Sequence, residues 1–165
     1  MTKHMTSISC REASKADIPA VLRLYAQPDF DNGNVLPISE AEQLFERIAR
    51  YPNYTIYIAF CEGQVVGTFT LLIMDNLGHM GTPSGVIEDV AVDPEWQGRS
   101  VGKLMMKHAF LLCSEKGCYK IALSSNLKRE TAHSFYESLG FERHGYSYRI
   151  SAQQDAPIDA TKRRG

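Results

Sequence analysis

Hydrophobic positions with helical spacing occur in four parts of the chain. From Ile18 onward, apolar side chains recur at i, i+3, i+4 and i+7, which places them on one face of a helix. Similar apolar stripes occur elsewhere, and the four predicted helices cover residues 18–25, 39–50, 101–117 and 132–139.

Residues typical of helix ends flank these segments. Asp17 is expected to cap the first helix, and Pro19 lies in its first turn, where a missing N–H costs little. Ser39 and Glu42 have the spacing of a capping box at the start of the second helix. Gly140 has the C′ position that ends the last helix.

Runs rich in β-branched and aromatic residues, separated by turn residues, predict the strands. They cover residues 6–12, 54–60, 65–74, 86–92 and 119–124, with one or two last strands in 141–150. Glu62-Gly63-Gln64 is expected to form a hairpin turn. A strand–helix–strand unit in the middle favours one parallel pair in an otherwise antiparallel sheet, and so an α/β fold of the α+β kind. We expect one domain over residues 1–150 and a flexible tail over 151–165.

Composition excludes several classes of protein. The chain has 165 residues, 44% of them hydrophobic and 22% charged, which is enough for a core without a disulfide or metal. A net charge of −1 argues against a nucleic-acid partner, and no apolar run is long enough to span a membrane. The four cysteines and five histidines show no metal-site spacing, and no secretory signal is recognised. We therefore expect a cytoplasmic protein with reduced thiols and no metal.

One segment carries the chemical signal. A predicted strand ends at Asp93-Pro94, and a glycine-containing turn over residues 97–103 leads into a helix. Unpaired N–H groups and the helix dipole favour an anion there, Gly98 and Gly102 allow close approach, and Arg99 and Lys103 add charge. The spacing matches neither a Walker A loop nor a dinucleotide-binding fingerprint. From these residues alone, a pyrophosphate cradle and an ordinary strand–helix turn both stay open.

The same segment resembles motif A of the GNAT N-acetyltransferase superfamily. Residues 97–102 match its Gln/Arg-x-x-Gly-x-Gly/Ala pattern, with Ser100 where glycine is usual. Residues 17–20 resemble the start of the family's first helix, and residues 132–141 resemble its motif B. The resemblance extends from about Ser9 to Ile150.

The resemblance implies a fold and a co-substrate. The fold is the acyl-CoA N-acyltransferase fold, with a mixed, mostly antiparallel sheet of about seven strands and about four helices. Acetyl-CoA is expected between two splayed parallel strands, here residues 86–92 and 119–124. The residues implied in binding it are Val90, Ala91, Val92, Gln97, Gly98, Arg99, Ser100, Val101, Gly102, Lys103, Asn126, Arg129, Phe135 and Tyr136.

Acetyl transfer to an amine needs a base, an oxyanion donor and a proton for the departing thiolate. The resemblance assigns oxyanion binding to the Val90 N–H and thiolate protonation to Tyr136, although a tyrosine on an apolar helix face also suits a core. Strand alternation predicts that Glu88 shares a face with Val90 and that Asp89 points to the opposite face. Glu88 is the expected base, directly or through water, and pairing of either carboxylate with an arginine is the alternative.

The expected activity is direct acetylation of a primary amine on a small molecule. Residues 87–92 and 117–121 resemble glucosamine-6-phosphate N-acetyltransferases, whereas residues 126–129 and 132–136 resemble aminoalkylphosphonate N-acetyltransferases. Two alternatives stay open: acetylation of a protein or peptide, and a non-catalytic acyl-CoA-binding regulatory module. A homodimer is expected from the resemblance alone.

Overall fold

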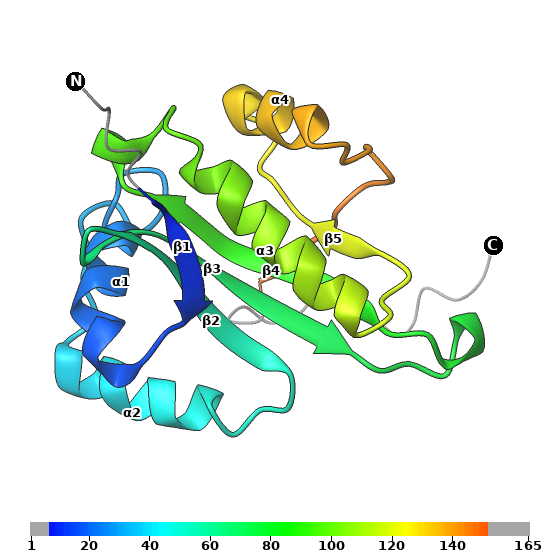
Figure 1. The fold of residues 1–165 in the computed structure, drawn as a ribbon, viewed down its shortest axis with the longest axis horizontal. Coiled ribbons are helices and arrows are strands. Elements are labelled where there is room, and N and C mark those ends of the chain that lie inside the picture. Colours follow the sequence, from blue (N-terminus) through cyan, green and yellow to red (C-terminus); the bar gives the residue numbers. More distant parts are fainter. Residues whose placement is uncertain (1–6, 152–165) are drawn as a thin grey trace, which may run out of the picture. The chain divides into compact units, whose positions relative to one another are not determined.

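The centre of the fold is a five-stranded sheet, seen here in a computed structural model that describes residues 7–151. The strands follow one another across the sheet in chain order (Figure 1). Their bounds are Ser9–Glu12 (β1), Tyr54–Cys61 (β2), Gln64–Met74 (β3), Ser84–Val92 (β4) and Ile121–Leu123 (β5). Successive strands from β1 to β4 are antiparallel, and β5 is parallel to β4, as the sequence predicts.

Helices pack on both faces of this sheet. The helices α1 (Ile18–Tyr25) and α2 (Ile38–Ile48) lie on one face, and α3 (Val101–Glu115) lies on the other (Figure 1). The face toward α3 buries Phe69, Leu71 and Ile87 against Met105 and its neighbours. Full burial of one such side chain stabilises a fold by roughly 1.5–3 kcal/mol, so this layer fixes α3 on the sheet.

The chain divides into two compact units, residues 1–124 and 125–165. The first contains the whole sheet with α1, α2 and α3. The second contains α4 (Glu130–Ser138), where the Tyr136 ring contacts both Phe135 and Phe141. An ion pair of 2.6 Å between Arg143 Nε and Glu137 Oε1 ties the segment after α4 to that helix.

Two expectations about strands need correction. The sheet has five strands rather than about seven, and residues 141–150 form no strand. Tyr146, Tyr148 and Ile150 are among the aromatic and β-branched residues of this segment, but their side chains are exposed. A strand without a paired neighbour has no partner for its backbone groups, and is not stable by itself. Of the predicted tail, residues 152–165 lie outside the described chain.

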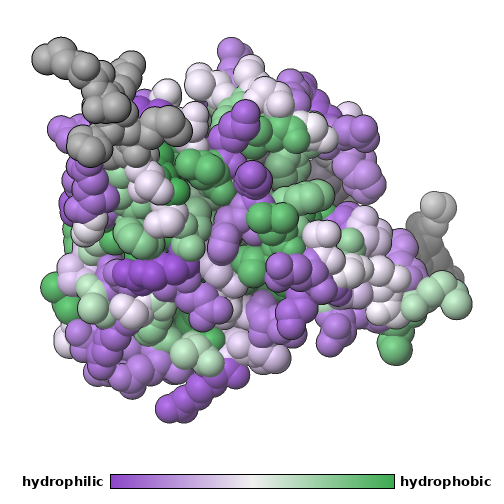
Figure 2. Space-filling model, viewed as in Figure 1, coloured by the Kyte–Doolittle hydropathy of each residue, from purple (hydrophilic) through white to green (hydrophobic). Residues whose placement is uncertain are grey.

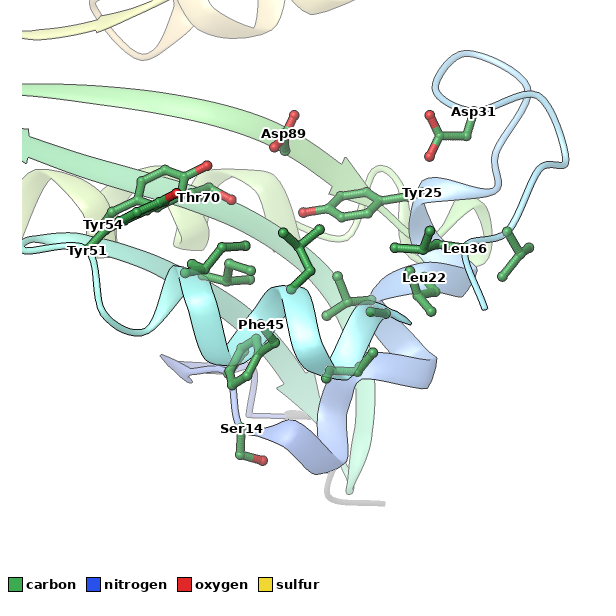
Figure 3. Close-up of a pocket in the computed structure, with 18 of the residues that line it drawn as sticks. Ser14, Leu22, Tyr25, Asp31, Leu36, Phe45, Tyr51, Tyr54, Thr70 and Asp89 are labelled. Carbon is green, nitrogen blue, oxygen red and sulfur yellow. The ribbon is translucent and has the colours of Figure 1, made fainter. Parts of the chain in front are cut away.

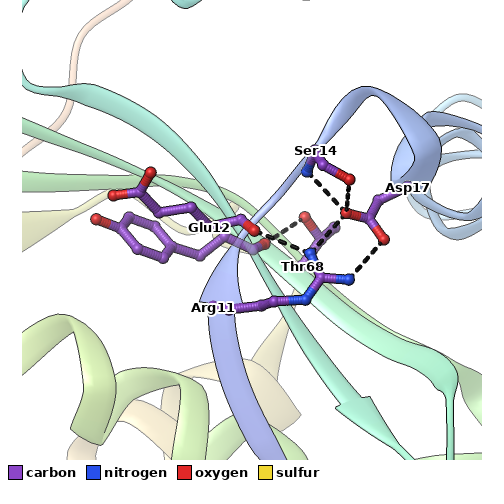
Figure 4. Close-up of polar contacts among 6 residues, drawn as sticks. Arg11, Glu12, Ser14, Asp17 and Thr68 are labelled. Carbon is purple, nitrogen blue, oxygen red and sulfur yellow. Dashed lines mark hydrogen bonds and ion pairs between the residues drawn. The ribbon is translucent and has the colours of Figure 1, made fainter.

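Two of the predicted helix-end residues behave differently from the prediction: Asp17 is the N-cap residue of α1 but makes no side-chain capping bond to that helix, and Ser39 does not cap α2. Asp17 ends a short 3₁₀ turn, and one of its carboxylate oxygens accepts hydrogen bonds from the Ser14 N–H and hydroxyl, at 2.7 and 2.8 Å (Figure 4). Arg11 holds the same carboxylate, so it is not available to cap α1. Ser39 lies inside α2, because Pro37 is already the residue from which that helix starts.

Hydrophobic and hydrophilic side chains are interspersed on the surface. On the face viewed in Figure 2, hydrophobic side chains form small patches between hydrophilic ones. Among the described residues, no helix combines the length and the hydrophobicity needed to cross a membrane.

Candidate active site

The two parallel strands of the sheet separate after a short paired stretch, as the family resemblance implies. The β4–β5 pairing consists of three register pairs, from Gly85↔Ile121 to Ile87↔Leu123. From Glu88 to Val92, β4 continues without β5 beside it. A strand edge without a neighbour presents backbone N–H and C=O groups that an extended ligand can pair with.

A β-bulge interrupts β4 at this opening. Thr70 lies opposite Glu88 and Thr68 lies opposite Ala91, so two steps along β3 match three steps along β4. Asp89 has φ 54°, a left-handed conformation that aspartate tolerates better than most residues.

The bulge overturns the predicted arrangement of side chains. Directly opposed residues share a face, so Glu88 and Ala91 lie on one face of β4, and Val90 points to the other. Asp89 is predicted to point to the face opposite Glu88. It instead lines a cavity on the α1 and α2 face of the sheet, the face on which Glu88 also lies. No arginine pairs with Glu88 or Asp89 in the described part of the chain, contrary to the alternative interpretation of these carboxylates.

The start of α3 forms a concave array of backbone amides. Gly98 and Ser100 have positive φ, 73° and 65°, and Ser100 is the N-cap residue. The first turn of a helix has no internal acceptors for its N–H groups, so those of Val101, Gly102 and Lys103 remain available. A Cβ placed on Gly98 would meet nothing within 4 Å, and the approach to the turn is therefore open.

The side chains of this turn leave the amides uncovered. The Arg99 guanidinium lies over the Trp96 ring, 5.1 Å from its centroid, and Asp93 accepts a hydrogen bond from the Glu95 N–H. The Asp93 N–H also donates to the Val66 carbonyl at 2.9 Å, so contacts within the turn and to β3 hold it in place. The predicted pyrophosphate residues 97–103 are thus brought together in a form that suits an anion.

A cavity of about 460 Å³ lies between the sheet and the two helices α1 and α2. Its polar groups include Tyr25, Tyr54, Thr70 and Asp89, and its apolar groups include Leu22 and Phe45 (Figure 3). This volume is within the range of small-molecule sites. The cavity is on the same face of the sheet as Glu88, the partner of Thr70.

Burial and like charge raise three pKa values beside the bulge. Burial, reinforced by the Asp89 charge, raises the pKa of Tyr25 to about 12, so this phenol remains a hydrogen-bond donor at neutral pH. Burial and then Asp31 raise the pKa of Asp89. Burial and then Asp89 raise the pKa of Glu88, which makes Glu88 a better proton acceptor than an ordinary glutamate.

The remaining predicted site residues, Asn126, Arg129, Phe135 and Tyr136, belong to the second unit. Asn126 uses its side-chain oxygen to accept the Lys128 N–H at 3.0 Å. Tyr136 is half-buried, and burial raises its pKa while Arg129 opposes the increase. Its phenol is therefore protonated at neutral pH, as a proton donor must be.

Sequence reasoning missed Tyr25 and misplaced Asp89. Tyr25 belongs to the helical stripe that predicts α1, and nothing local distinguishes it from a core residue. Adjacent carboxylates inside an apolar strand were the available signal for the bulge, because aspartate tolerates the conformation that a bulge requires.

Comparisons with known proteins show what the chain and its fold are similar to. A family model described as Acetyltransferase (GNAT) family matches residues 18–141. A solved acetyltransferase structure from Agrobacterium tumefaciens str. C58 is similar with a TM-score of 0.81 and 32% identity, covering 87% of this chain and 99% of that one.

Curated relatives share shorter segments. A glucosamine 6-phosphate N-acetyltransferase of Trypanosoma brucei brucei is 37% identical over 94 residues, 55% of this chain and 62% of its own length. An aminoglycoside N(6')-acetyltransferase type 1 of Stenotrophomonas maltophilia is 28% identical over 136 residues, 80% of this chain and 84% of its own. The match to the first of these spans less than two thirds of that relative. The sequence resemblances to glucosamine-6-phosphate and aminoalkylphosphonate N-acetyltransferases are confirmed.

Proposed function

The chain belongs to the acetyltransferase (GNAT) family, and from this premise we propose that it transfers the acetyl group of acetyl-CoA directly to the primary amine of a small molecule. The observation that carries the proposal is the open edge of β4 in the same unit as the uncovered amides of α3. Curated relatives named for small amine substrates support this choice of acceptor.

We propose that acetyl-CoA binds to the residues that the family resemblance implies. Residues 98–103 bind its pyrophosphate through the free N–H groups at the start of α3, and the side chains of Gln97, Arg99 and Lys103 supply further contacts. The edge of β4 at Val90, Ala91 and Val92 pairs with the pantetheine arm. Asn126, Arg129, Phe135 and Tyr136 are proposed contacts from the second unit.

The reaction then needs three groups. The neutral amine nitrogen attacks the thioester carbon, a C–N bond forms, and the C–S bond breaks. Glu88 accepts the amine proton, directly or through water, and its raised pKa suits this role. The Val90 N–H donates to the developing oxyanion, and Tyr136 donates its proton to the leaving thiolate.

Calorimetry with acetyl-CoA, followed by thiol release in the presence of an amine library, tests the proposal. We expect saturable acetyl-CoA binding and thiol release that depends on a primary amine. Absence of acetyl-CoA binding would exclude the enzyme and the binding module together. Tight binding without turnover on any amine would favour the regulatory module, and turnover on peptides alone would favour protein acetylation.

Tyr136→Phe separates catalysis from binding. We expect kcat to fall about 10²-fold or more, the usual range for loss of a general acid, with little change in the acetyl-CoA Kd. Tyr146→Phe, which alters an exposed tyrosine of the same unit, is the matched control and should keep full activity. Equal activity of both variants would remove Tyr136 from the mechanism.

We also propose a cytoplasmic homodimer, on the family resemblance. Sedimentation velocity over a range of concentrations measures the oligomeric state, and a single monomeric species at all concentrations would refute the dimer.

A further inference from the structure

The cavity beneath α1 and α2 indicates which amines this protein accepts. We propose that its acceptor is a lipophilic primary amine, with its apolar body between α1, α2 and the sheet and its nitrogen at Asp89. The proposal rests on the acetyltransferase function proposed above and specifies the substrate class for it.

Apolar and aromatic side chains dominate the lining. They are Ala13, Ile18, Val21, Leu22, Tyr25, Val35, Leu36, Ala41, Leu44, Phe45, Ile48, Tyr51, Tyr54 and Ile56. The remaining lining residues are Ser14, Asp31, Asn34, Thr70 and Asp89. An amino sugar would leave most of its hydroxyl groups unpaired against such a wall, and each buried unpaired polar group costs about 1–3 kcal/mol.

The charge of the lining selects a cation. Asp31 and Asp89 are the charged lining residues, and the lining includes no lysine, arginine or histidine. A phosphate or phosphonate in this cavity would meet carboxylates and no counter-charge, whereas an ammonium group is attracted to them. The sequence resemblance to enzymes for phosphorus-containing amines therefore does not extend to the chemistry of this cavity.

Several polar groups of the cavity lie near the strand that carries the proposed reaction site. Asp89 and the hydroxyl groups of Tyr25, Tyr54 and Thr70 lie toward the sheet, while Leu22 and Phe45 project from the helices (Figure 3). In the described chain no hydrogen-bond or ion-pair partner occupies the Asp89 carboxylate, so it is available to an ammonium group. Because Val90 follows Asp89 directly, the amine end of such a ligand lies at the bulge where β4 opens.

Chain length provides the sharpest test. We expect kcat/KM for butylamine, pentylamine and hexylamine to rise about fourfold per methylene, since burial of one methylene stabilises by about 0.8 kcal/mol. Phenethylamine should also be a good acceptor. Glucosamine 6-phosphate and 2-aminoethylphosphonate should be poorer than hexylamine by about 100-fold or more.

Variants locate the effect in the cavity. Leu44→Gln and Leu36→Gln place an amide in the lining at partly exposed positions, and each should raise the hexylamine KM about tenfold. Leu77→Gln makes the same change at a fully exposed position outside the lining and should leave KM unchanged. Asp89→Asn should raise KM for every amine, because the ammonium group loses its counter-charge.

The outcomes separate this inference from the function on which it rests. Acetyl-CoA turnover that is independent of alkyl length, or that prefers the phosphorylated amines, overturns the lipophilic acceptor and leaves the acetyltransferase intact. Hexylamine binding to the CoA complex by calorimetry, weakened in Leu44→Gln and not in Leu77→Gln, supports the cavity assignment even without turnover. Absence of acetyl-CoA binding refutes the proposed function, and failure of hexylamine to bind refutes the inference.

Discussion

Asp17 is held by more hydrogen bonds than any other carboxylate in the described chain. Arg11 donates to both its oxygens, at 2.7 and 3.0 Å, and Ser14 adds two further donors. The hydrogen bond from Arg11, with smaller effects from Ser14, lowers the pKa of Asp17 to about 2 although burial opposes the shift. The network fastens β1 to the start of α1, and so to one wall of the cavity (Figure 4).

This lowered pKa predicts a pH-dependent contribution to stability. A carboxylate with a folded pKa below its unfolded value stabilises the fold above the unfolded pKa, about 3.9, and loses that effect as pH falls toward 2. Asp17→Asn should lower the free energy of unfolding by about 1–2 kcal/mol at pH 7, allowing for solvent screening. Urea denaturation at several pH values measures it.

The difference in the free energy of unfolding between wild type and Asp17→Asn should become smaller as pH falls from 4 to 2. Glu46→Gln, which removes an exposed ion pair with Lys15, is the control and should have a much smaller effect. A pH-independent difference would contradict the assignment.

Ser100 carries backbone strain at the proposed pyrophosphate site. A left-handed φ costs a residue with a Cβ roughly 1–2 kcal/mol, and glycine avoids this cost. Ser100→Gly should therefore raise the free energy of unfolding by about 0.5–1 kcal/mol, because the added freedom of the unfolded chain offsets part of the gain. Thermal unfolding measures the change, and Ser114→Gly, inside α3, should lower stability instead. Equal shifts of the same sign would show that Ser100 is unstrained.

Among the secondary-structure elements, the bulge in β4 carries two adjacent carboxylates, and the charge of Asp89 affects the pKa of Glu88. Burial and the Asp89 charge raise the pKa of Glu88. In a plot of kcat against pH, the loss of activity on the acidic side, the acidic limb, should therefore occur at a higher pH than the usual pKa of a glutamate predicts. Asp89→Asn removes a negative neighbour, so the limb should move to lower pH. Glu88→Gln should abolish the limb, and a normal limb in that variant would remove Glu88 as the base.

Close contact between α3 and the sheet depends on glycine in two strands. A Cβ on Gly85 would lie 2.5 Å from the Cys113 Sγ, and one on Gly67 would lie 2.6 Å from the Met105 Sδ. Gly85→Ala should lower the free energy of unfolding by about 1–3 kcal/mol through overpacking. Chemical denaturation of Gly85→Ala, Cys113→Ala and the double variant tests the contact, and the double variant should be less destabilised than the sum of the single variants. Strict additivity would mean that α3 does not press on β4 at this point.

At the scale of the whole molecule, the proposed ligand should stabilise the fold by mass action. Acetyl-CoA at 100 times its Kd adds about 2.7 kcal/mol to the free energy of unfolding. Thermal unfolding should report this as a rise in Tm, and hydrogen exchange should show protection of amides in residues 88–92 and 98–103. Acetyl-pantetheine, which lacks the pyrophosphate, should protect the first segment only. Equal protection of 98–103 by both compounds would contradict the pyrophosphate assignment.

Features that depend on residues adjacent in the chain could be predicted from the amino-acid sequence. The turn at Glu62-Gly63 is present, with both residues at positive φ, a conformation that glycine adopts readily. The four helices lie where apolar stripes predicted them, and the parallel pair follows from the helix between its strands. The glycine-containing turn before α3 is likewise encoded by consecutive residues, 97–103. The family model confirms the family that this motif resembles.

The directions and surroundings of the β4 carboxylates depend on contacts between distant parts of the chain, and no local pattern predicts them. The bulge depends on the register between β3 and β4, and one inserted residue reverses the face of every position after it. The cavity gathers side chains from α1, α2 and three strands, so no local pattern contains it. The strand predicted in 141–150 fails for the same reason. A run of β-branched and aromatic residues shows that a segment suits a sheet, but pairing needs a neighbouring strand that the segment itself cannot supply.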